Sequence, residues 1–374
     1  MVRPTYHLEA RHPRSETAYS FSSADGVHSK KALRRSETLL ADAVDVSAAS
    51  KIYVHRGNYG VLSVLLGDEV VDGRVTMTDR SARAVALAEH NVAENKADNV
   101  SVELDYEPPG SEYAASLYAP RPYESVDMVK AELLDLVEAT KTGGLVCVAA
   151  DQSSGFRRYK SFLDSLPGGS QVVARDESYR VVTYEVSEEP LRTSVHPTSS
   201  FTASWRDVEA SFTAFQGLFS NTGLDAGTQV LLEALPSTVS GDVLDLCCGY
   251  GAIGVFLAKQ NEASLTLSDD DVLATQAARI NCDDNSVGAR VVTRDCLSGF
   301  QEDSFDVIVT NPPTHAGRGV LEELVLGSQI CLRDNGCFYA VFNDPVGFDD
   351  LLRPEFSVER LVDDDFVVVR ATPR

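Results

Sequence analysis

Residues 243–254 read VLDLCCGYGAIG, an apolar run that passes into a glycine-rich turn and then into a helical pattern. Glycine has no Cβ atom, so Gly249 and Gly251 permit a tight turn and let a ligand approach the backbone closely. A helix that begins directly after the turn presents unpaired N–H groups at its first turn. The stretch therefore predicts a nucleotide-type binding loop between a strand and a helix.

A second informative stretch, TNPPTH at residues 310–315, closes another apolar run. A planar amino group is a poor nucleophile because its lone pair is delocalised. The Asn311 side-chain oxygen and the Pro312 carbonyl can each accept an N–H bond from such a nitrogen, which draws it toward tetrahedral geometry and directs its lone pair. Pro312 and Pro313 also fix φ and remove competing N–H donors. The stretch therefore offers two acceptors suited to an amino nitrogen, and Asn-Pro-Pro is equally a turn that ends a strand.

Around these motifs, short apolar runs alternate with helical patterns, which is typical of strand–helix units around a parallel sheet. We expect a doubly wound α/β fold, in which ligands bind beyond the carboxyl ends of the strands. The apolar runs are 243–246, 264–267, 289–292, 305–310, 337–342 and 366–370, and helical patterns at 271–283 and 319–332 lie between them.

The chain also contains an internal repeat, in which residues of the first half recur about 190 positions later. Two tandem Rossmann-like folds with mostly parallel sheets are therefore expected, the first of them degenerate. The matched positions are Gly26–Ser29 with Gly217–Ser220, Tyr59-Gly60 with Tyr250-Gly251, and Asn91, Asn95 and Asp105 with Asn281, Asn285 and Asp295.

Further along the repeat, Ser125–Val129 aligns with Ser304–Ile308 if a segment near residues 108–122 is looped out. On this alignment, Ala131–Leu134 stands where the second half has Thr310–Pro313. The first half is therefore expected to lack the site for an amino nitrogen.

A polar stretch at residues 187–200 contains two prolines and no periodicity, which predicts a linker. We place two domains at residues 1–191 and 192–374.

Asp245, ahead of the glycines, resembles the first residue of the DxGxGxG loop of class I S-adenosylmethionine (SAM)-dependent methyltransferases, where a dehydrogenase would have glycine. Asn-Pro-Pro similarly resembles the NPP tetrapeptide of amino-methyltransferases. The resemblance implies SAM as cofactor, with its amino-acid part at the loop, its ribose hydroxyls at Asp269 and its adenine at Asp295. The expected cofactor-binding residues are Asp245, Cys247, Gly249, Gly251, Asp269, Asp295 and Asn311.

Residues 217–220 (GLFS), 224–228 (LDAGT) and 311–315 (NPPTH) together resemble the ribosomal RNA guanine-N2 methyltransferases over nearly the whole chain. The resemblance implies a degenerate first half that helps folding and docks RNA, and a second half that binds SAM. It implies methyl transfer to the exocyclic N2 amino group of a guanine in ribosomal RNA or a ribosomal subunit. The expected catalytic residues are Asn311, Pro312, Pro313 and His315, the last from the NPPxH pattern.

Three substitutions depart from this pattern. In the first half Val54 and Asn58 replace Asp245 and Gly249, so catalysis there is not expected. In the second half Thr314 stands where the family usually has an aromatic ring that stacks on the base. Two alternatives stay open: a protein-glutamine N-methyltransferase, and a catalytically inactive SAM- and RNA-binding assembly factor.

Composition limits the compartment and the partners. No apolar run is long enough to span a bilayer, and the N-terminal residues lack the apolar core of a signal peptide, so a cytoplasmic protein without a membrane partner is expected. Seven cysteines without CxxC spacing argue against a disulfide framework and against a metal site. The two-half design favours a monomer.

The formal net charge of −23 repels a polyanion, but acidic runs and few lysines favour a halophile surface, where salt screens the repulsion. Of the 33 Lys and Arg residues, 21 lie before residue 191, so contacts with phosphates are expected from the first half. The expected substrate-contacting residues are Thr314, Arg34, Arg35, Arg157 and Arg158.

Overall fold

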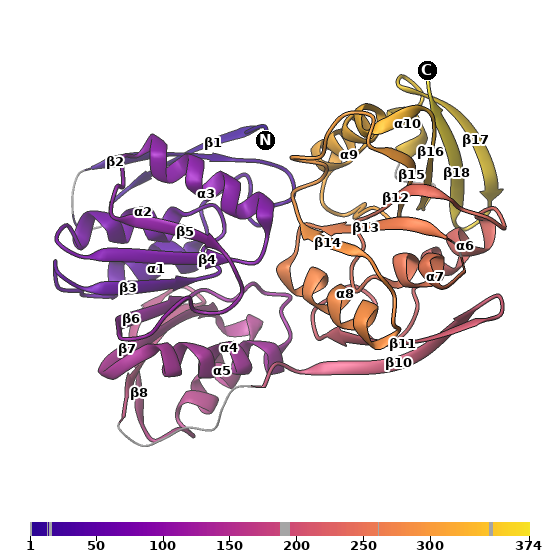
Figure 1. Cartoon of the computed structure of the whole chain (residues 1–374). Coiled ribbons are helices and arrows are strands. Elements are labelled where there is room, and N and C mark those ends of the chain that lie inside the picture. Colours follow the sequence, from indigo (N-terminus) through magenta and orange to yellow (C-terminus); the bar gives the residue numbers. More distant parts are fainter. Residues whose placement is uncertain (1, 13, 15–16, 188–194, 261, 344–346) are drawn as a thin grey trace. The chain divides into compact units, whose positions relative to one another are not determined.

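The computed structural model describes residues 2–12, 14, 17–187, 195–260, 262–343 and 347–374. Its contacts divide the chain into a first unit, Val2–Pro197, and a second unit, Thr198–Arg374 (Figure 1). The expected boundary between residues 191 and 192 lies outside the described residues. In the part of the chain that the structure describes, no helix has the length and hydropathy needed to cross a bilayer.

The second unit is built on a seven-stranded sheet of order β14-β13-β12-β15-β16-β18-β17. Its first five strands run parallel, and β18 is antiparallel to both β16 and β17. The strands are β12 (Gly241–Leu246), β13 (Ala263–Asp269), β14 (Arg290–Thr293), β15 (Phe305–Thr310), β16 (Leu332–Phe342), β17 (Phe356–Asp363) and β18 (Val367–Pro373). The helices are α6 (Ala226–Ala234), α7 (Ala252–Gln260), α8 (Val272–Asp284), α9 (Arg318–Cys331) and α10 (Phe348–Leu352).

This topology confirms the doubly wound arrangement and places the two motifs together. The strand order reverses at β12, which pairs with β13 on one side and with β15 on the other. Leu246 at the end of β12 is the register partner of Thr310 at the end of β15. The glycine loop and the NPPTH stretch therefore begin side by side at the carboxyl edge of the sheet, where ligands of such folds bind.

Helices α9 and α10 cover one face of the sheet and fix the positions of its central strands. Leu321 and Leu324 of α9 pack against Leu244, Ile308 and Phe338 of β12, β15 and β16, all of them buried. A strand buried among helices reads as a continuous apolar run. The runs of the sequence therefore identified these strands correctly, whereas β17, which is more exposed, was not predicted.

A hairpin of β10 (Thr198–Trp205) and β11 (Val208–Phe215) precedes this sheet. It is anchored by Asn281 of α8, whose Oδ1 accepts a hydrogen bond from Thr213 N at 2.7 Å and whose Nδ2 donates to the carbonyls of Thr213 and Tyr250. The prediction of a linker over 187–200 is thus wrong for residues 198–200, which belong to β10, because polar residues alternating with apolar ones also suit an exposed hairpin.

The first unit repeats this plan with a sheet of order β5-β4-β3-β6-β7-β9-β8 and a preceding β1–β2 hairpin. Its strands are β1 (Tyr6–Arg11), β2 (Ala18–Ser23), β3 (Lys51–His55), β4 (Arg74–Asp79), β5 (Val100–Leu104), β6 (Tyr113–Tyr118), β7 (Thr140–Asp151), β8 (Gly168–Asp176) and β9 (Tyr179–Val186). Its helices are α1 (Arg35–Ala43), α2 (Val61–Glu69), α3 (Ala82–Glu94), α4 (Val126–Ala139) and α5 (Phe156–Leu163), with a short 3₁₀ turn at Gln152–Ser154.

Details of the repeat are also shared. Asn91 of α3 holds the β1–β2 hairpin as Asn281 holds its counterpart: its Oδ1 accepts from Ser22 N, and its Nδ2 donates to the carbonyls of Ser22 and Tyr59. The expectation of two tandem folds is confirmed.

The alignment of Ser125–Val129 with Ser304–Ile308 is wrong. Tyr118 in β6 pairs with the end of β3 as Thr310 in β15 pairs with the end of β12, so β6 is the counterpart of β15. The stretch Ala119–Pro122 therefore replaces Asn311–Thr314, and Ala131–Leu134 lies inside α4. A short apolar run broken by one Asp suits the first turn of a helix as well as a buried strand, which is why the pattern misled.

Candidate active site

The glycine loop leaves β12 through three residues with left-handed backbone. Cys247, Gly249 and Gly251 have φ of 60°, 54° and 87°. A Cβ atom at Gly251 would lie 3.0 Å from the Leu267 side chain and 3.1 Å from the Ala278 side chain, so this glycine is required by packing. At Gly249 a Cβ atom would meet no heavy atom of the described chain within 4 Å. Gly249 therefore borders open space, as a ligand-binding turn requires.

Asp245 lies under this loop with a fully buried carboxylate. Its Oδ2 accepts a hydrogen bond from Gly254 N at 2.8 Å, while no described residue donates a hydrogen bond to its buried Oδ1. Burial, reinforced by the negative charge of Asp269 and opposed by the Gly254 N–H, raises the pKa of Asp245 to about 7. A buried acceptor without a partner is costly, and it fits a site completed by a ligand donor.

Asp269 ends β13 beside the same loop. Its Oδ2 accepts from Gly249 N at 2.9 Å and its Oδ1 accepts from Asp271 N at 3.0 Å, so two backbone groups hold the carboxylate in place. Burial and then the charge of Asp271 raise the pKa of Asp269 to about 6. The carboxylate is held at the position where the resemblance puts the ribose hydroxyls of the cofactor.

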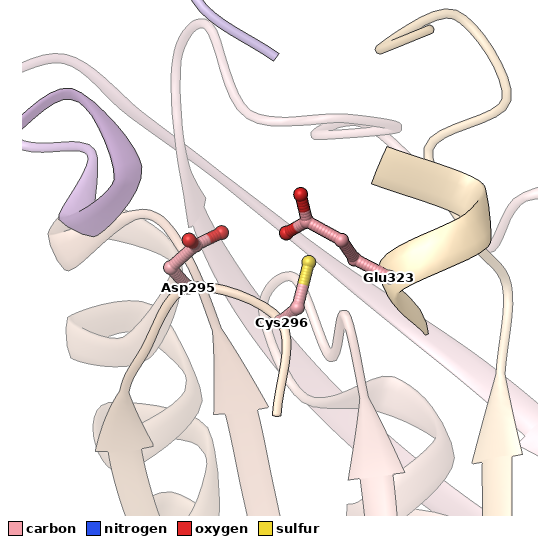
Figure 2. Close-up of side chains that lie close together, drawn as sticks. All are labelled: Asp295, Cys296 and Glu323. Atoms are coloured by element: carbon pink, nitrogen blue, oxygen red, sulfur yellow. The ribbon is translucent and has the colours of Figure 1, made fainter. Parts of the chain in front are cut away.

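Asp295 follows β14 and belongs to a group that sequence spacing did not show. Figure 2 shows its carboxylate near the Cys296 sulfur and the Glu323 carboxylate of α9, and the ligand atoms of the three residues lie within 4.8 Å of one another. Two carboxylates and a thiolate are ligand types that a divalent metal ion can bind. Because Asp295 is the expected adenine contact, Cys296 and Glu323 border the same end of the predicted cofactor site.

The NPPTH stretch begins directly after β15, and its asparagine is held by the loop before α6. Asn311 Nδ2 donates to Asp225 Oδ2 at 3.0 Å and to Thr228 Oγ1 at 3.0 Å. An ionised carboxylate only accepts hydrogen bonds, so Asp225 fixes which end of the amide faces it. The amide oxygen of Asn311 is therefore turned away from Asp225.

Asp225 was quoted in the family resemblance, but its role was not predicted from the sequence. It is the N-cap of α6, where its Oδ2 also accepts from Thr228 N at 2.9 Å. An Asp before an apolar helical pattern is a local signal for such a cap. No local signal shows that the cap also reaches Asn311, which lies 86 residues further along the chain.

The remaining residues of the stretch surround Asn311. The Pro312 carbonyl accepts a hydrogen bond from Thr314 N at 2.8 Å, which leaves its second lone pair for an amino group. Thr314 is half-buried, whereas the His315 side chain is exposed. The structure thus brings the Asn311 amide, the Pro312 carbonyl and the glycine loop to one edge of the sheet.

A family model described as the methyltransferase small domain matches residues 18–183 and again residues 209–370. The chain belongs to this family. The two matches correspond to the two units, and they confirm the expectation of tandem methyltransferase folds with SAM as the cofactor of a methyl transfer.

Individual relatives agree with this family. The ribosomal RNA small subunit methyltransferase C of Actinobacillus succinogenes is 33% identical over 151 residues, which cover 39% of this chain and 45% of that protein. The protein of the same name from Pseudoalteromonas atlantica is 29% identical over 273 residues, covering 69% of this chain and 76% of that relative. A solved structure of the T. thermophilus 16S rRNA N2 G1207 methyltransferase (RsmC), in complex with AdoMet and guanosine, is similar with a TM-score of 0.83 and 26% identity, covering 99% of this chain and 98% of that one.

In the first unit of this methyltransferase small domain protein, the chain's own side chains occupy the equivalent site. Asn58 has φ of 55°, close to that of Gly249, but its side chain donates to the His28 carbonyl at 2.8 Å. Arg121, from the Ala119–Pro122 stretch, donates to Asp79 Oδ2 at 3.2 Å. Asp79 is the counterpart of Asp269, because it likewise accepts a hydrogen bond from the backbone N–H of the glycine-loop position.

The first unit has further buried charges besides the Arg121–Asp79 pair. Arg56 is ion-paired with Glu124 at 2.6 Å and with Glu132 at 3.2 Å, and Tyr118 Oη donates to Glu132 at 2.5 Å. Burial alone would raise the pKa of Glu132, but Arg56, then His55 and the Tyr118 hydroxyl, outweigh it and hold that pKa well below its ordinary range. The first unit therefore has internal ion pairs and side-chain hydrogen bonds around this site, whereas Gly249 of the second unit borders open space.

The four basic residues expected to contact phosphate are placed differently. Arg34 is only 5% exposed, and its guanidinium donates to Glu37 and to the carbonyls of Ala119 and Pro120, so it is committed to the protein interior. Arg35 is exposed and ion-paired with Asp176. The structure places both remaining arginines, Arg157 and Arg158, exposed on α5.

We expect Asp225→Asn to lower kcat by about 10- to 100-fold, because an amide can present either face to Asn311 and no longer fixes its orientation. Asn is also a good N-cap, so the thermal midpoint is expected to change little. The affinity for SAM, measured by calorimetry, is expected to stay unchanged. Asp207→Asn, which removes an exposed carboxylate from the β10–β11 turn, is the matched control. A kcat equal to that of the control would contradict the positioning role.

The pKa of Asp245 predicts how stability depends on pH. This carboxyl titrates near 7 when folded against an ordinary value of 3.8, so between these pH values the folded state keeps a proton that the unfolded state releases. Its stabilisation is complete below about pH 3.8 and is lost as the pH rises through about 7. Asp245→Asn stays neutral, so its stability relative to wild type is expected to increase from pH 5 to pH 8.

Urea unfolding of the ligand-free protein tests this expectation. Trp205 of β10 is the chain's single tryptophan, and its fluorescence reports on the second unit. Asp207→Asn serves again as the exposed control. A stability difference between Asp245→Asn and wild type that is independent of pH would refute the assignment.

Arg121→Ala is expected to reduce the free energy of unfolding of the first unit by about 3–5 kcal/mol, because it leaves the buried Asp79 carboxylate without its counterion. Lys130→Ala breaks an exposed pair with Asp127 and is expected to cost about 0.5 kcal/mol or less. Calorimetry of the full chain measures both changes, with Trp205 fluorescence identifying the transition of the second unit. Equal losses for the two variants would show that the Arg121–Asp79 pair contributes no special stability.

Proposed function

We propose that the second unit transfers the methyl group of SAM to the exocyclic N2 amino group of a guanine in ribosomal RNA. The observation that carries this proposal is the hydrogen bond from Asn311 Nδ2 to Asp225, which turns the amide oxygen of Asn311 away from the carboxylate. An oriented acceptor next to a SAM-type loop is what methylation of a planar amino group requires.

The chemistry follows from the acceptors. The Asn311 oxygen and the second lone pair of the Pro312 carbonyl each accept one N–H of the target amino group. These two bonds draw the nitrogen toward tetrahedral geometry and restore its lone pair as a nucleophile. The amino group loses its extra proton after the methyl group has been attached.

The cofactor residues fit SAM on two observations made on this chain. The Asp245 Oδ1 is buried without a donor among the described residues, and Gly249 borders open space. Asp245, Gly249 and Gly251 would hold the amino-acid part, Asp269 the ribose and Asp295 the adenine. When bound, SAM supplies an electrophilic methyl group on its sulfonium sulfur.

The substrate class is supported by the relatives. Two of the similar proteins are named as ribosomal RNA small subunit methyltransferases, and the similar solved structure contains guanosine together with AdoMet. The exposed Arg157 and Arg158 of α5 are proposed to contact RNA phosphates. Because the net charge is −23, the RNA complex is expected to need high salt to screen repulsion from the rest of the surface.

The same proposal covers the compartment and the assembly state. Ribosomal RNA as substrate supports a cytoplasmic location. A cofactor site and an RNA-contacting unit in one chain support action as a monomer.

Methyl transfer from tritium-labelled SAM, at molar salt, into ribosomal RNA from cells that lack this protein tests the proposal. The label is expected to be recovered as N2-methylguanosine. Asn311→Ala is expected to abolish transfer while calorimetry shows SAM binding retained. Label in a protein fraction with unlabelled RNA would favour a glutamine side chain as substrate, and SAM binding without transfer to either would favour an inactive assembly factor.

A further inference from the structure

Phe219 is a large aromatic side chain that is 65% exposed. It lies in the loop of residues 216–225, between β11 and α6. Two contacts hold this loop against the site: Asp225 accepts from Asn311, and Tyr250 Oη of the glycine loop donates to the Gly223 carbonyl at 3.3 Å. The loop therefore adjoins both the glycine turn and the NPPTH stretch.

The repeat indicates where the side chain at this position points. His28 is the counterpart of Phe219 in the first unit, and its carbonyl accepts from Asn58, the counterpart of Gly249. The His28 ring makes a T-shaped contact with Tyr123, with ring centroids 5.7 Å apart. Tyr123 is the counterpart of His315. The side chain at position 28 thus faces the segment that follows the Ala119–Pro122 stretch.

Electrostatics supports the same placement. Burial and then the positive charges of Arg34 and Arg121 lower the pKa of His28 to about 4. Arg34 and Arg121 are the counterparts of Asp225 and Pro313 in the second unit. The His28 ring therefore lies over the part of the first unit that corresponds to the substrate end of the site.

Two positions that flank this side chain have the same backbone φ in both units, which supports the same placement in the second unit. Gly26 and Gly217 have φ of 92° and 91°, and Ser29 and Ser220 have φ of 56° and 53°. A left-handed serine is uncommon, and its recurrence shows that the turn is conserved in geometry. One difference remains: the second unit, over its described residues, has no ring contact between Phe219 and His315, and both of these side chains are exposed.

We propose that Phe219 is the ring on which the target guanine stacks, in the place that the His28–Tyr123 contact fills in the first unit. The inference rests on the proposed function and adds the residue that selects a base. Thr314 has no ring, so the surface expected after NPP must come from another element. Bases stack on exposed aromatic side chains in single-stranded RNA recognition. Phe219 supplies such a surface beside the amino-group acceptors Asn311 and Pro312.

Phe219→Trp provides a direct measurement of stacking. The native Trp205 is buried, so an indole at position 219 dominates the solvent-exposed emission. Guanosine, added in the presence of S-adenosylhomocysteine, is expected to quench this emission saturably. Ile330→Trp, at the exposed carboxyl end of α9, is the matched control and is expected to show no saturable quenching. Equal quenching in both variants would overturn the inference.

Phe219→Ala is expected to weaken binding of a guanine-containing ribosomal RNA fragment by about 10-fold, whereas Phe219→Tyr keeps the affinity within about twofold. The affinity for SAM is expected to stay unchanged in both variants, and Trp205 fluorescence confirms that they fold. Guanine labelling by wild type with unchanged RNA affinity in Phe219→Ala would overturn the stacking inference alone. A wild-type enzyme that labels no guanine would overturn the proposed function, and this inference with it.

Discussion

The hydrogen bond between Asn311 and Asp225 is the interaction on which the proposed chemistry of the second unit depends. It joins the end of β15 to the cap of α6, two segments that only the fold brings together. Its effect is directional, because a carboxylate that can only accept leaves one orientation for the amide. The reversal of strand order beside β12 then places this oriented amide next to the glycine loop. The geometry of the proposed catalytic site is therefore a property of the sheet's connectivity as much as of the motif.

The two units differ in how the carboxylates at the equivalent sites are stabilised. Each carries a carboxylate at the end of a parallel strand, Asp79 or Asp269, that is held by backbone N–H groups. In the first unit the guanidinium of Arg121 neutralises Asp79. In the second unit no Lys or Arg among the described residues forms an ion pair with Asp245 or Asp269, and burial raises the pKa values of both. The second unit thus keeps carboxylates whose burial is unfavourable until a ligand binds. In the first unit the ion pair with Arg121 removes this cost.

The sequence predicted what is local and periodic. The apolar runs of the buried strands, the glycine turn and the Asn-Pro-Pro stretch are all contiguous, and the asparagine matches of the repeat were correct because each asparagine performs the same anchoring. Sequence patterns did not identify contacts between residues that lie far apart in the chain, and they misled where one pattern suits both helix and strand. Asp225 read only as part of a family motif, the Ser125–Val129 run fitted helix and strand equally well, and Arg34 looked like a surface cation although it is buried. A sequence pattern does not show which buried partner a charged side chain contacts in the fold.

Asn58 and Arg121 also determine whether the first unit could bind a ligand at the equivalent site. In the first unit the Asn58 side chain donates to the His28 carbonyl and Arg121 pairs with Asp79, while Val54 stands where the second unit has Asp245. A cofactor site like that of the second unit would need different residues at all three positions. Removing Arg121 alone would leave the buried Asp79 carboxylate without its counterion. A single substitution at Arg121 is therefore expected to lower stability without creating a binding site. The side chains that close the first site to a ligand are thus also the ones that stabilise the first unit as a scaffold.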